Sequence, residues 1–359
     1  MTEQDLQNPN FNPGGIPHIP DVRDFQWRDI GSAIPPFDWS AGYDVETLLE
    51  AKLNSPGFKL PVKDQNGSGS CGGQATSQED GVLEAFADAG FEERSAKYVI
   101  AQTFVLDSNG QMLGSRFKDN GDLVRNQGVS REALCPSYDN GQPPTDAFMN
   151  RIGDITEAAR ADAKFSKTKS YAYVSPTIDD FAQALATNFG MIMLLRGSNN
   201  GTWGSPFPQP GLRKWAHFMY VGKAKLINGA KFIGAINSWG KNIGENGWQW
   251  FGENYFASGN IDLGQTMLFA DLIPPPPKYV FTRDLHIGSA GVDVKFLQIF
   301  LNAHNCPVAD SGPGSPGHET STFGILTQQA LEKFQRDNAI TPAFGYFGPL
   351  TRTKVNAMQ

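Results

Sequence analysis

Cysteine is scarce in this sequence of 359 residues, and its spacing argues against two common uses. The three cysteines, Cys71, Cys135 and Cys306, are odd in number and far apart, which argues against a disulfide framework. No Cys-x-x-Cys pair occurs, which argues against a cysteine-bound zinc site. We therefore expect no metal and no other cofactor, and each cysteine has to be considered by itself.

Long hydrophobic runs and clusters of basic residues are also missing. No stretch of 18 apolar residues occurs, so no membrane-spanning segment is predicted. The net charge is −7 and no Lys/Arg cluster is present, which argues against a nucleic-acid partner. Residues 1–5 are polar and acidic, unlike a secretory signal. We expect a monomer that acts outside the cell or in the cell envelope. The protein would be exported with a signal that is then removed or, if it is phage-encoded, would stay in the cytoplasm until the cell lyses.

What is present indicates a globular chain of more than one domain. Hydrophobic residues make up 40% and charged residues 19% of a chain that is too long for one ordinary core. Four consecutive prolines at 274–277 favour a stiff linker. The predicted parts are an extended arm (1–40), a large domain (41–273), a linker (274–280) and a small domain (281–359).

The small domain contains an internal repeat. Segments 323–327 and 347–351 are similar in sequence, and apolar residues follow each at helical spacing. We expect Thr327 and Thr351 to cap two helices. A third helix is predicted from residues that share one face: Val294, Leu297, Phe300 and Leu301. This pattern predicts a small three-helix domain.

The large domain combines one clear helix with several later strands. Residues 74–89 are predicted to form the helix. Asn228 and Gly229 are typical of a hairpin turn and stand between the last two predicted strands. The order of elements favours an α+β fold. The predicted strands are 171–174, 191–195, 217–221 and 231–236.

Cys71 is a candidate nucleophile. It follows the glycine-rich loop 66–70 and precedes the predicted helix, whose free N–H groups would stabilise a thiolate. The alternative is a flexible Gly/Ser loop that contains a buried cysteine.

His217 and Asn237 are candidate partners of this cysteine. His217 lies in an apolar strand, where a histidine is commonly a core residue, but Asn237 at the end of the next strand could fix its tautomer. A strict two-residue turn would place Asn237 opposite Tyr220 instead of His217. The turn must therefore be longer, or a β-bulge must shift the register.

Four features in this order resemble the papain family of cysteine peptidases. They are Gln65 six residues before Cys71, His217 located 146 residues after it, the run Asn237-Ser238-Trp239-Gly240, and the following Gly-Glu-Asn-Gly-Trp at 244–248. The resemblance covers about residues 55–260. It implies two lobes, one helical and one an antiparallel β-barrel-like lobe.

The resemblance also implies a role for each of these residues. Cys71 would attack a peptide carbonyl as a thiolate paired with protonated His217, and Asn237 would orient the histidine. The side-chain amide of Gln65 and the backbone N–H of Cys71 would bind the oxyanion. Trp239 would cover the histidine–asparagine contact and border the substrate.

The sequence departs from the family's pattern around the nucleophile. Gly72 and Gly73 replace the usual aromatic residue and its neighbour, and two glycines in a first helical turn each cost about 1 kcal/mol relative to alanine. The long inhibitory pro-segment of the family is absent, and segment 20–25 resembles the start of a mature bacterial member. Whether arm 1–40 blocks the cleft is left open. Gly114 and Ser115 fall where the family binds substrate backbone, although an ordinary turn would explain them equally well.

The small domain resembles the three-helix peptidoglycan-binding module of bacterial and phage wall hydrolases, through positions that include Gly291, Leu297, Phe334 and the run 345–352. Our leading hypothesis is a cysteine endopeptidase that is tethered to bacterial wall material and hydrolyses proteins or peptides. The alternatives are a lysin that cleaves peptidoglycan stem peptides and a non-catalytic wall-binding or virion protein on a peptidase scaffold.

Overall fold

A computed structural model describes residues 14–17, 26–27, 36–87, 90–139, 141–142, 144–270, 279–316 and 318–358. Most of the predicted arm, segment 20–25 and the prolines at 274–277 lie outside the described residues. The chain forms two compact units, Met1–Ile273 and Pro274–Gln359. Within the described residues, no helix has the length and apolar character needed to cross a membrane.

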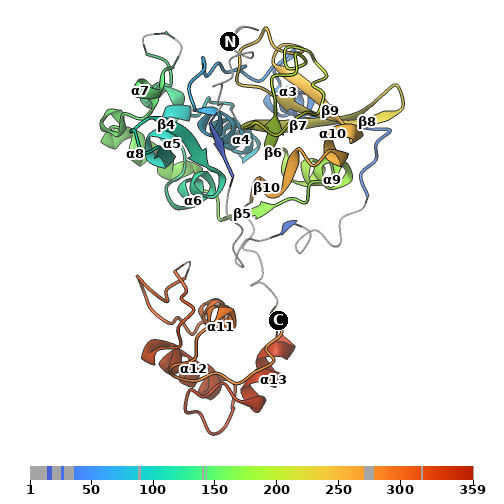
Figure 1. Cartoon of the computed structure of the whole chain (residues 1–359). Helices are drawn as coiled ribbons and strands as arrows, with labels where there is room; N and C mark the ends of the chain where they lie inside the picture. The colour runs from blue at the N-terminus through green and yellow to red at the C-terminus, as the bar shows by residue number, and fades with distance from the viewer. Residues whose placement is uncertain are drawn as a thin grey trace. The chain divides into compact units, whose positions relative to one another are not determined.

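One lobe of the larger unit is helical (Figure 1). Its long central helix, α4, begins three residues before the predicted start. A small sheet with strand order β1-β4-β3 lies beside these helices. The elements are α4 (Cys71–Ala87), α5 (Ala96–Thr103), α6 (Phe117–Gln127), α7 (Asp146–Met149), α8 (Glu157–Ala163), β1 (Gly15–Ile16), β3 (Phe104–Leu106) and β4 (Met112–Arg116), with 3-10 turns at Glu132–Leu134, Ile152–Asp154 and Lys164–Ser166. The preceding helix α3 (Val45–Leu53) lies beside β7 and β9 of the other lobe (Figure 1).

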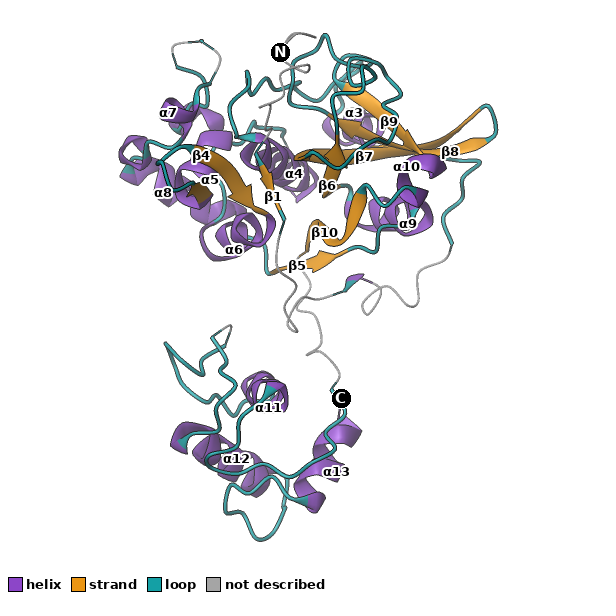
Figure 2. Cartoon of the chain, viewed as in Figure 1, coloured by secondary structure: helices purple, strands orange, loops and turns teal. Residues whose placement is uncertain are grey.

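The other lobe is an antiparallel sheet with strand order β5-β10-β6-β7-β8-β9, to which β2 adds by pairing with β7 (Figure 2). Three of the four predicted strands lie within strands of this sheet, and the fourth, 171–174, extends one residue past the end of β5. The α+β, two-lobe fold predicted from the sequence is thus the observed one. The elements are β2 (Tyr43–Asp44), β5 (Ser170–Tyr173), α9 (Ile178–Asn188), β6 (Met191–Gly197), β7 (Trp215–Ile227), β8 (Ala230–Ile236), β9 (Trp248–Gly252), α10 (Glu253–Ala257) and β10 (Ile261–Ala270).

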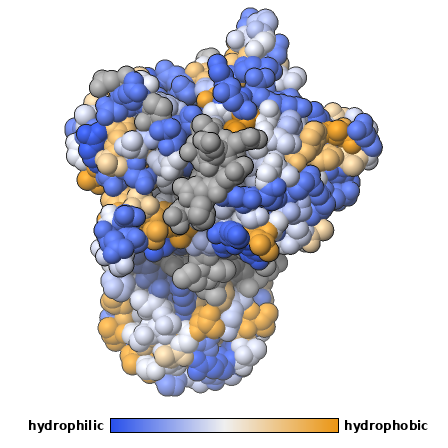
Figure 3. Space-filling model, turned by 45° about the horizontal axis from the view of Figure 1, so that its top comes forward, coloured by the Kyte–Doolittle hydropathy of each residue, from blue (hydrophilic) through white to orange (hydrophobic). Residues whose placement is uncertain are grey.

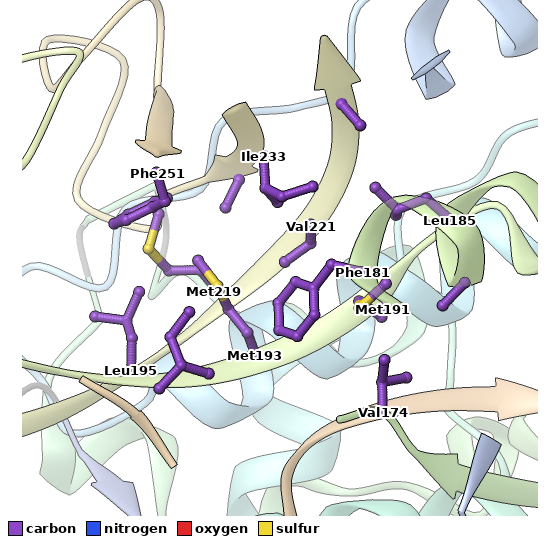
Figure 4. Close-up of a cluster of buried hydrophobic side chains, with 14 of the residues drawn as sticks. Val174, Phe181, Leu185, Met191, Met193, Leu195, Met219, Val221, Ile233 and Phe251 are labelled. Atoms are coloured by element: carbon purple, nitrogen blue, oxygen red, sulfur yellow. The ribbon is translucent and has the colours of Figure 1, made fainter. Parts of the chain in front are cut away.

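Strand β7 is the centre of the larger unit because both of its faces are buried. Met219 and Val221 point into a core that β6 and α9 complete, and Figure 4 shows them beside Met193 and Phe181. The alternate residue Phe218 belongs to a second core, which includes Cys71 of α4. A strand covered on both faces is apolar along its length, which explains the continuous hydrophobic run around His217.

The hairpin of β7 and β8 settles the register question. Ile227 pairs with Ala230, so the turn holds only Asn228 and Gly229, both with positive φ, as a type I′ turn requires. The shift comes instead from a β-bulge at Gly222, between the pairs Val221–Ala235 and Lys223–Gly234. The continued register places Asn237 opposite Met219, which shares a face with His217. Without the bulge, Asn237 would lie on the opposite face.

The smaller unit consists of α11 (Val292–Ala303), α12 (Ile325–Asp337) and α13 (Pro349–Met358) around one core. Its repeat is built on two buried amides. The Nε2 of Gln298 donates to Thr327 Oγ1 at 2.8 Å, and the Nε2 of Gln335 donates to Thr351 Oγ1 at 2.9 Å. The prediction that the two threonines cap helices is wrong, because both lie inside the first turn, where these amides bind them. Gly324 is the N-cap of α12.

The surface carries no single apolar face in the view of Figure 3, where hydrophobic residues lie in small groups among hydrophilic ones. Several of the exposed hydrophobic side chains belong to the smaller unit. They include Ile287, Val292, Ile325, Leu326, Phe344, Tyr346 and Leu350.

Candidate active site

Cys71 is the first residue of α4, so it lies at a helix N-terminus, as expected of a candidate nucleophile. The preceding loop turns through Asn66 and Gly67, both with positive φ, so that the chain enters the helix sharply. The thiol is fully buried, and its Sγ accepts a hydrogen bond from the backbone N–H of Phe218 at 3.5 Å. This bond ties the start of α4 to β7, next to His217.

Close packing explains why glycine occupies positions 72 and 73. A Cβ on Gly72 would lie 2.1 Å from Ser115 Oγ, and one on Gly73 would lie 2.5 Å from the carbonyl oxygen of Ala96. Real Cβ atoms do not approach so closely, so glycine lets α4 pack directly against β4 and α5. This contact offsets the poor helix propensity of the two residues, and the helix begins at Cys71 despite them.

His217 and Asn237 form a direct hydrogen bond, with His217 Nε2 and Asn237 Oδ1 2.9 Å apart. The indole of Trp239 stacks on the imidazole, with ring centroids 4.5 Å apart, and shields the bond. All three side chains are buried, and Trp239 is only 1% exposed. Among the described residues, His217 Nδ1 has no hydrogen-bond partner. The second imidazole nitrogen is therefore the one left for a reacting group.

Gln65 is held at both ends of its side-chain amide. Its Nε2 donates to the Ser68 carbonyl at 2.5 Å, and its Oε1 accepts from Ser238 Oγ at 2.7 Å. Its backbone N–H also donates to the Ser238 carbonyl at 2.8 Å. Ser238 follows Asn237 directly, so one strand end positions both the candidate oxyanion donor and the residue that orients His217.

Burial favours the neutral forms of Cys71 and His217 in this closed state. It raises the pKa of the Cys71 thiol to about 12, against the opposing effect of the N–H groups of Phe218 and Gly72. It lowers the pKa of His217 to about 4, although the bond to Asn237 acts in the other direction. The lowered thiol pKa expected from the helix N-terminus is therefore not met here, because loss of hydration outweighs the helix end. Among the described residues, no hydrogen bond joins Cys71 to His217.

Gly114 and Ser115, the predicted substrate-binding residues, lie on β4, where the chain's own N-terminal segment pairs with Ser115 and Gly14 packs against Gly114. Strand β1 runs parallel to β4, and Ser115 N–H donates to the carbonyl oxygen of Gly14 at 3.1 Å. We call residues 14–17 the N-terminal strap. A Cβ on Gly14 would lie 2.1 Å from the Gly69 oxygen, and one on Gly15 would lie 2.7 Å from the Ala216 oxygen. The strap therefore lies between the segment that precedes Cys71 and the segment that precedes His217.

Sequence reasoning missed three residues that hold the candidate site. Asp146 accepts a hydrogen bond from Gly69 N–H at 2.8 Å, and Ser238 holds Gln65. Gln249 accepts a hydrogen bond from Asn237 Nδ2 at 2.8 Å. Gln249 left a signal in the sequence, as a single polar residue among the aromatic residues of β9, and Ser238 stands in the recognised run 237–240, although that run did not reveal its contact with Gln65. Asp146 left no signal, because it begins the short helix α7, whose position depends on the tertiary fold.

The larger unit is similar to solved cysteine proteases. Xylellain, a cysteine protease from Xylella fastidiosa, is 20% identical with a TM-score of 0.56, and the match covers 72% of this chain and 96% of xylellain. For proCathepsin B S9 from Trypanosoma congolense, the identity is 9% and the TM-score 0.51, over 75% and 89% of the two chains. Digestive procathepsin L 3 of Tenebrio molitor larval midgut is 17% identical with a TM-score of 0.50, and the match covers 75% of this chain and 79% of that protein.

The sequence itself matches no protein-family model and no curated protein. The similarity is thus one of fold. The chain contains the two-lobe fold of the papain-like cysteine proteases.

Proposed function

We propose that the protein is a cysteine endopeptidase with Cys71 as nucleophile and His217 as its base. The bond from His217 Nε2 to Asn237 Oδ1 carries this proposal, because it leaves Nδ1 as the nitrogen that can take the thiol proton. A buried imidazole that is oriented on one side and unpartnered on the other is costly in a purely structural core. The position of Cys71 at the start of α4, bonded to the residue after His217, supports the same role.

The proposed reaction has two halves. The Cys71 sulfur attacks the peptide carbonyl while its proton passes to His217 Nδ1, and the resulting oxyanion takes hydrogen bonds from Gln65 Nε2 and the Cys71 N–H. The imidazolium then protonates the leaving amine as the C–N bond breaks, which leaves a thioester. Water, deprotonated by His217, attacks the thioester and releases the carboxylate and the free thiol.

We further propose that the N-terminal strap has to leave before substrate can bind. It occupies the edge of β4 at Ser115, and a substrate backbone would need the same N–H group. The fully buried thiol and imidazole are consistent with a covered site. The strap runs parallel to β4 and places two glycines where any side chain would collide with the cleft walls.

The wall-binding role of the smaller unit is a separate proposal, supported by its three-helix fold and by the sequence resemblance. A module that holds the enzyme on the wall would raise its local concentration at substrates there without adding catalytic contacts.

One experiment tests the peptidase proposal and the wall-binding proposal. The full chain is treated with an irreversible thiol-directed peptide epoxide and assayed on casein and on purified sacculi, beside Cys71→Ala and the control Cys135→Ala, which removes another buried thiol. Labelling and casein cleavage that only Cys71→Ala abolishes support the peptidase. Loss of wall-peptide hydrolysis in Cys71→Ala identifies a lysin instead. A chain that is not labelled even after removal of residues 1–17 contradicts both enzymes. Co-sedimentation with sacculi that survives Cys71→Ala but not removal of residues 279–359 supports the tether.

A further inference from the structure

Gln249 is a buried polar residue that the proposed reaction does not use. It stands in β9, where its neighbours Trp248, Trp250 and Phe251 are apolar, and its side chain is 0% exposed. Its amide makes three hydrogen bonds. Nε2 donates to the Trp203 carbonyl at 2.7 Å and to the Ser205 carbonyl at 3.0 Å, and Oε1 accepts from Asn237 Nδ2 at 2.8 Å.

The two backbone carbonyls fix which way the Gln249 amide points. A carbonyl oxygen can only accept a hydrogen bond, so the amide must turn its NH₂ group toward Trp203 and Ser205. The reversed amide would place an oxygen against two oxygens and leave all three without a donor, at a cost of about 1–3 kcal/mol for each buried group left unsatisfied. Its Oε1 consequently faces Asn237.

The same reasoning then applies to Asn237 and His217. With an oxygen of Gln249 facing it, the Asn237 amide must present Nδ2 to Gln249 and Oδ1 to the imidazole. An oxygen that faces His217 Nε2 requires a hydrogen on Nε2. In the neutral ring that hydrogen leaves the lone pair on Nδ1, where the thiol proton has to go.

Trp203, whose carbonyl begins this chain of bonds, is itself held in place. Trp203 is 2% exposed and packs against two further indoles, with its ring centroid 4.8 Å from that of Trp215 and 5.6 Å from that of Trp239. Trp239 is the residue that stacks on His217. The aromatic cluster therefore packs on the imidazole and also holds Trp203, whose carbonyl is one of the two acceptors that orient Gln249.

We propose that Gln249 is a positioning residue that sets the amide orientation of Asn237 and, through it, the tautomer of His217. Gln249 acts through Asn237 and makes no bond to His217 itself. The inference rests on the proposed function for its catalytic consequence, but the tautomer can be measured without any substrate.

The test compares Gln249→Met with the parent in the full chain. Methionine fills a similar volume but cannot bond to Asn237, so the Asn237 amide is free to reverse. We expect the ¹⁵N NMR signals of the His217 ring, identified by their loss in His217→Gln, to change from the Nε2–H form to a mixture of tautomers. We expect kcat/KM to fall about 10- to 100-fold, mainly through kcat, the range found for residues that orient metal ligands from behind.

A rescue variant separates positioning from general stability. Aspartate at 237 presents an oxygen to His217 in either orientation, but it also places an oxygen against Gln249 Oε1. Asn237→Asp should therefore reduce activity in the parent and restore it in Gln249→Met. The control Gln298→Met removes another buried amide, in the smaller unit, and should leave the His217 signals unchanged.

Three outcomes would overturn the proposal: an Nδ1–H tautomer in the parent, His217 signals that Gln249→Met does not alter, or additive effects in the double variant. If Gln249→Met does not fold, Gln249→Glu keeps the volume, offers at most one hydrogen to the two carbonyls and is measured in the same way. A parent that shows the Nε2–H form but neither cleaves peptides nor reacts with the epoxide would contradict the proposed function and not the role of Gln249.

Discussion

The N-terminal strap offers the most direct perturbation, because one added methyl group should release it. In Gly15→Ala the new Cβ would lie 2.6 Å from Leu194 Cδ1 and 2.7 Å from the Ala216 carbonyl oxygen. The leucine methyl can move, but the backbone of β7 at Ala216 is fixed by its pairing with β6. Overpacking of this kind costs about 1–3 kcal/mol.

That cost falls on the closed state alone, because the added methyl collides with nothing once the strap has left the cleft. A loss of 1–3 kcal/mol raises the open population about 5- to 150-fold while the closed state still dominates. We expect alkylation of Cys71 by iodoacetamide, followed by mass spectrometry of the Cys71 peptide, to accelerate by the same factor. Removal of residues 1–17 should set the upper limit.

The matched control is Gly153→Ala, whose new Cβ would have no atom within 4 Å. It should react at the parent's rate. If Gly15→Ala and the truncated chain also react at the parent's rate, the strap does not limit access to Cys71 and the proposed block is refuted.

Three further predictions concern pH and packing. Burial lowers the pKa of His217 to about 4 from its usual 6.5, so between these pH values the unfolded chain binds a proton that the folded chain excludes. The free energy of unfolding, measured in urea, should therefore fall by about 3 kcal/mol from pH 6.5 to pH 4, and the fall should be smaller in His217→Gln. Burial raises the pKa of Cys71 to about 12, so the closed chain should hold a neutral thiol: the ultraviolet absorbance of a thiolate, taken as the difference between the parent and Cys71→Ala, should not appear near neutral pH, and its presence there would show that the thiolate already exists. Gly222→Ala would place a Cβ 2.7 Å from Val45 Cγ1 and 2.9 Å from Tyr220 Cε1. We expect the free energy of unfolding, measured by thermal unfolding, to fall by about 1–3 kcal/mol and the turnover to fall with it. If neither value changes, the bulge tolerates a side chain.

The fold class and much of the secondary structure could be predicted from the sequence, because they depend on local patterns. The apolar run around His217, the Asn228–Gly229 turn and the helical spacing in the small domain are signals of this kind, and each corresponds to an observed element. The prediction that Thr327 and Thr351 cap helices is wrong because an N-cap is defined by its backbone geometry, which the spacing of residues does not fix. The buried glutamines that bind Thr327 and Thr351 come from the preceding helices.

The sequence by itself also determined the identity of the candidate residues, since Gln65, Cys71, His217 and Asn237 stand at family-typical distances. Only the tertiary structure decided how they meet. The bulge at Gly222 moves Asn237 to the face of His217, a shift that a strand pattern cannot reveal because it depends on the pairing of two strands.

The properties of the site that the sequence did not reveal depend on hydration and on long-range contacts. The ionisation of Cys71 follows from its complete burial, which outweighs the helix N-terminus that the sequence showed. The roles that we propose for the strap and for Gln249 arise from contacts between residues far apart in the chain, Gly14 with Ser115 and Gln249 with Trp203. Residue spacing fixed which groups could react, and three-dimensional packing fixed their orientation, charge and access.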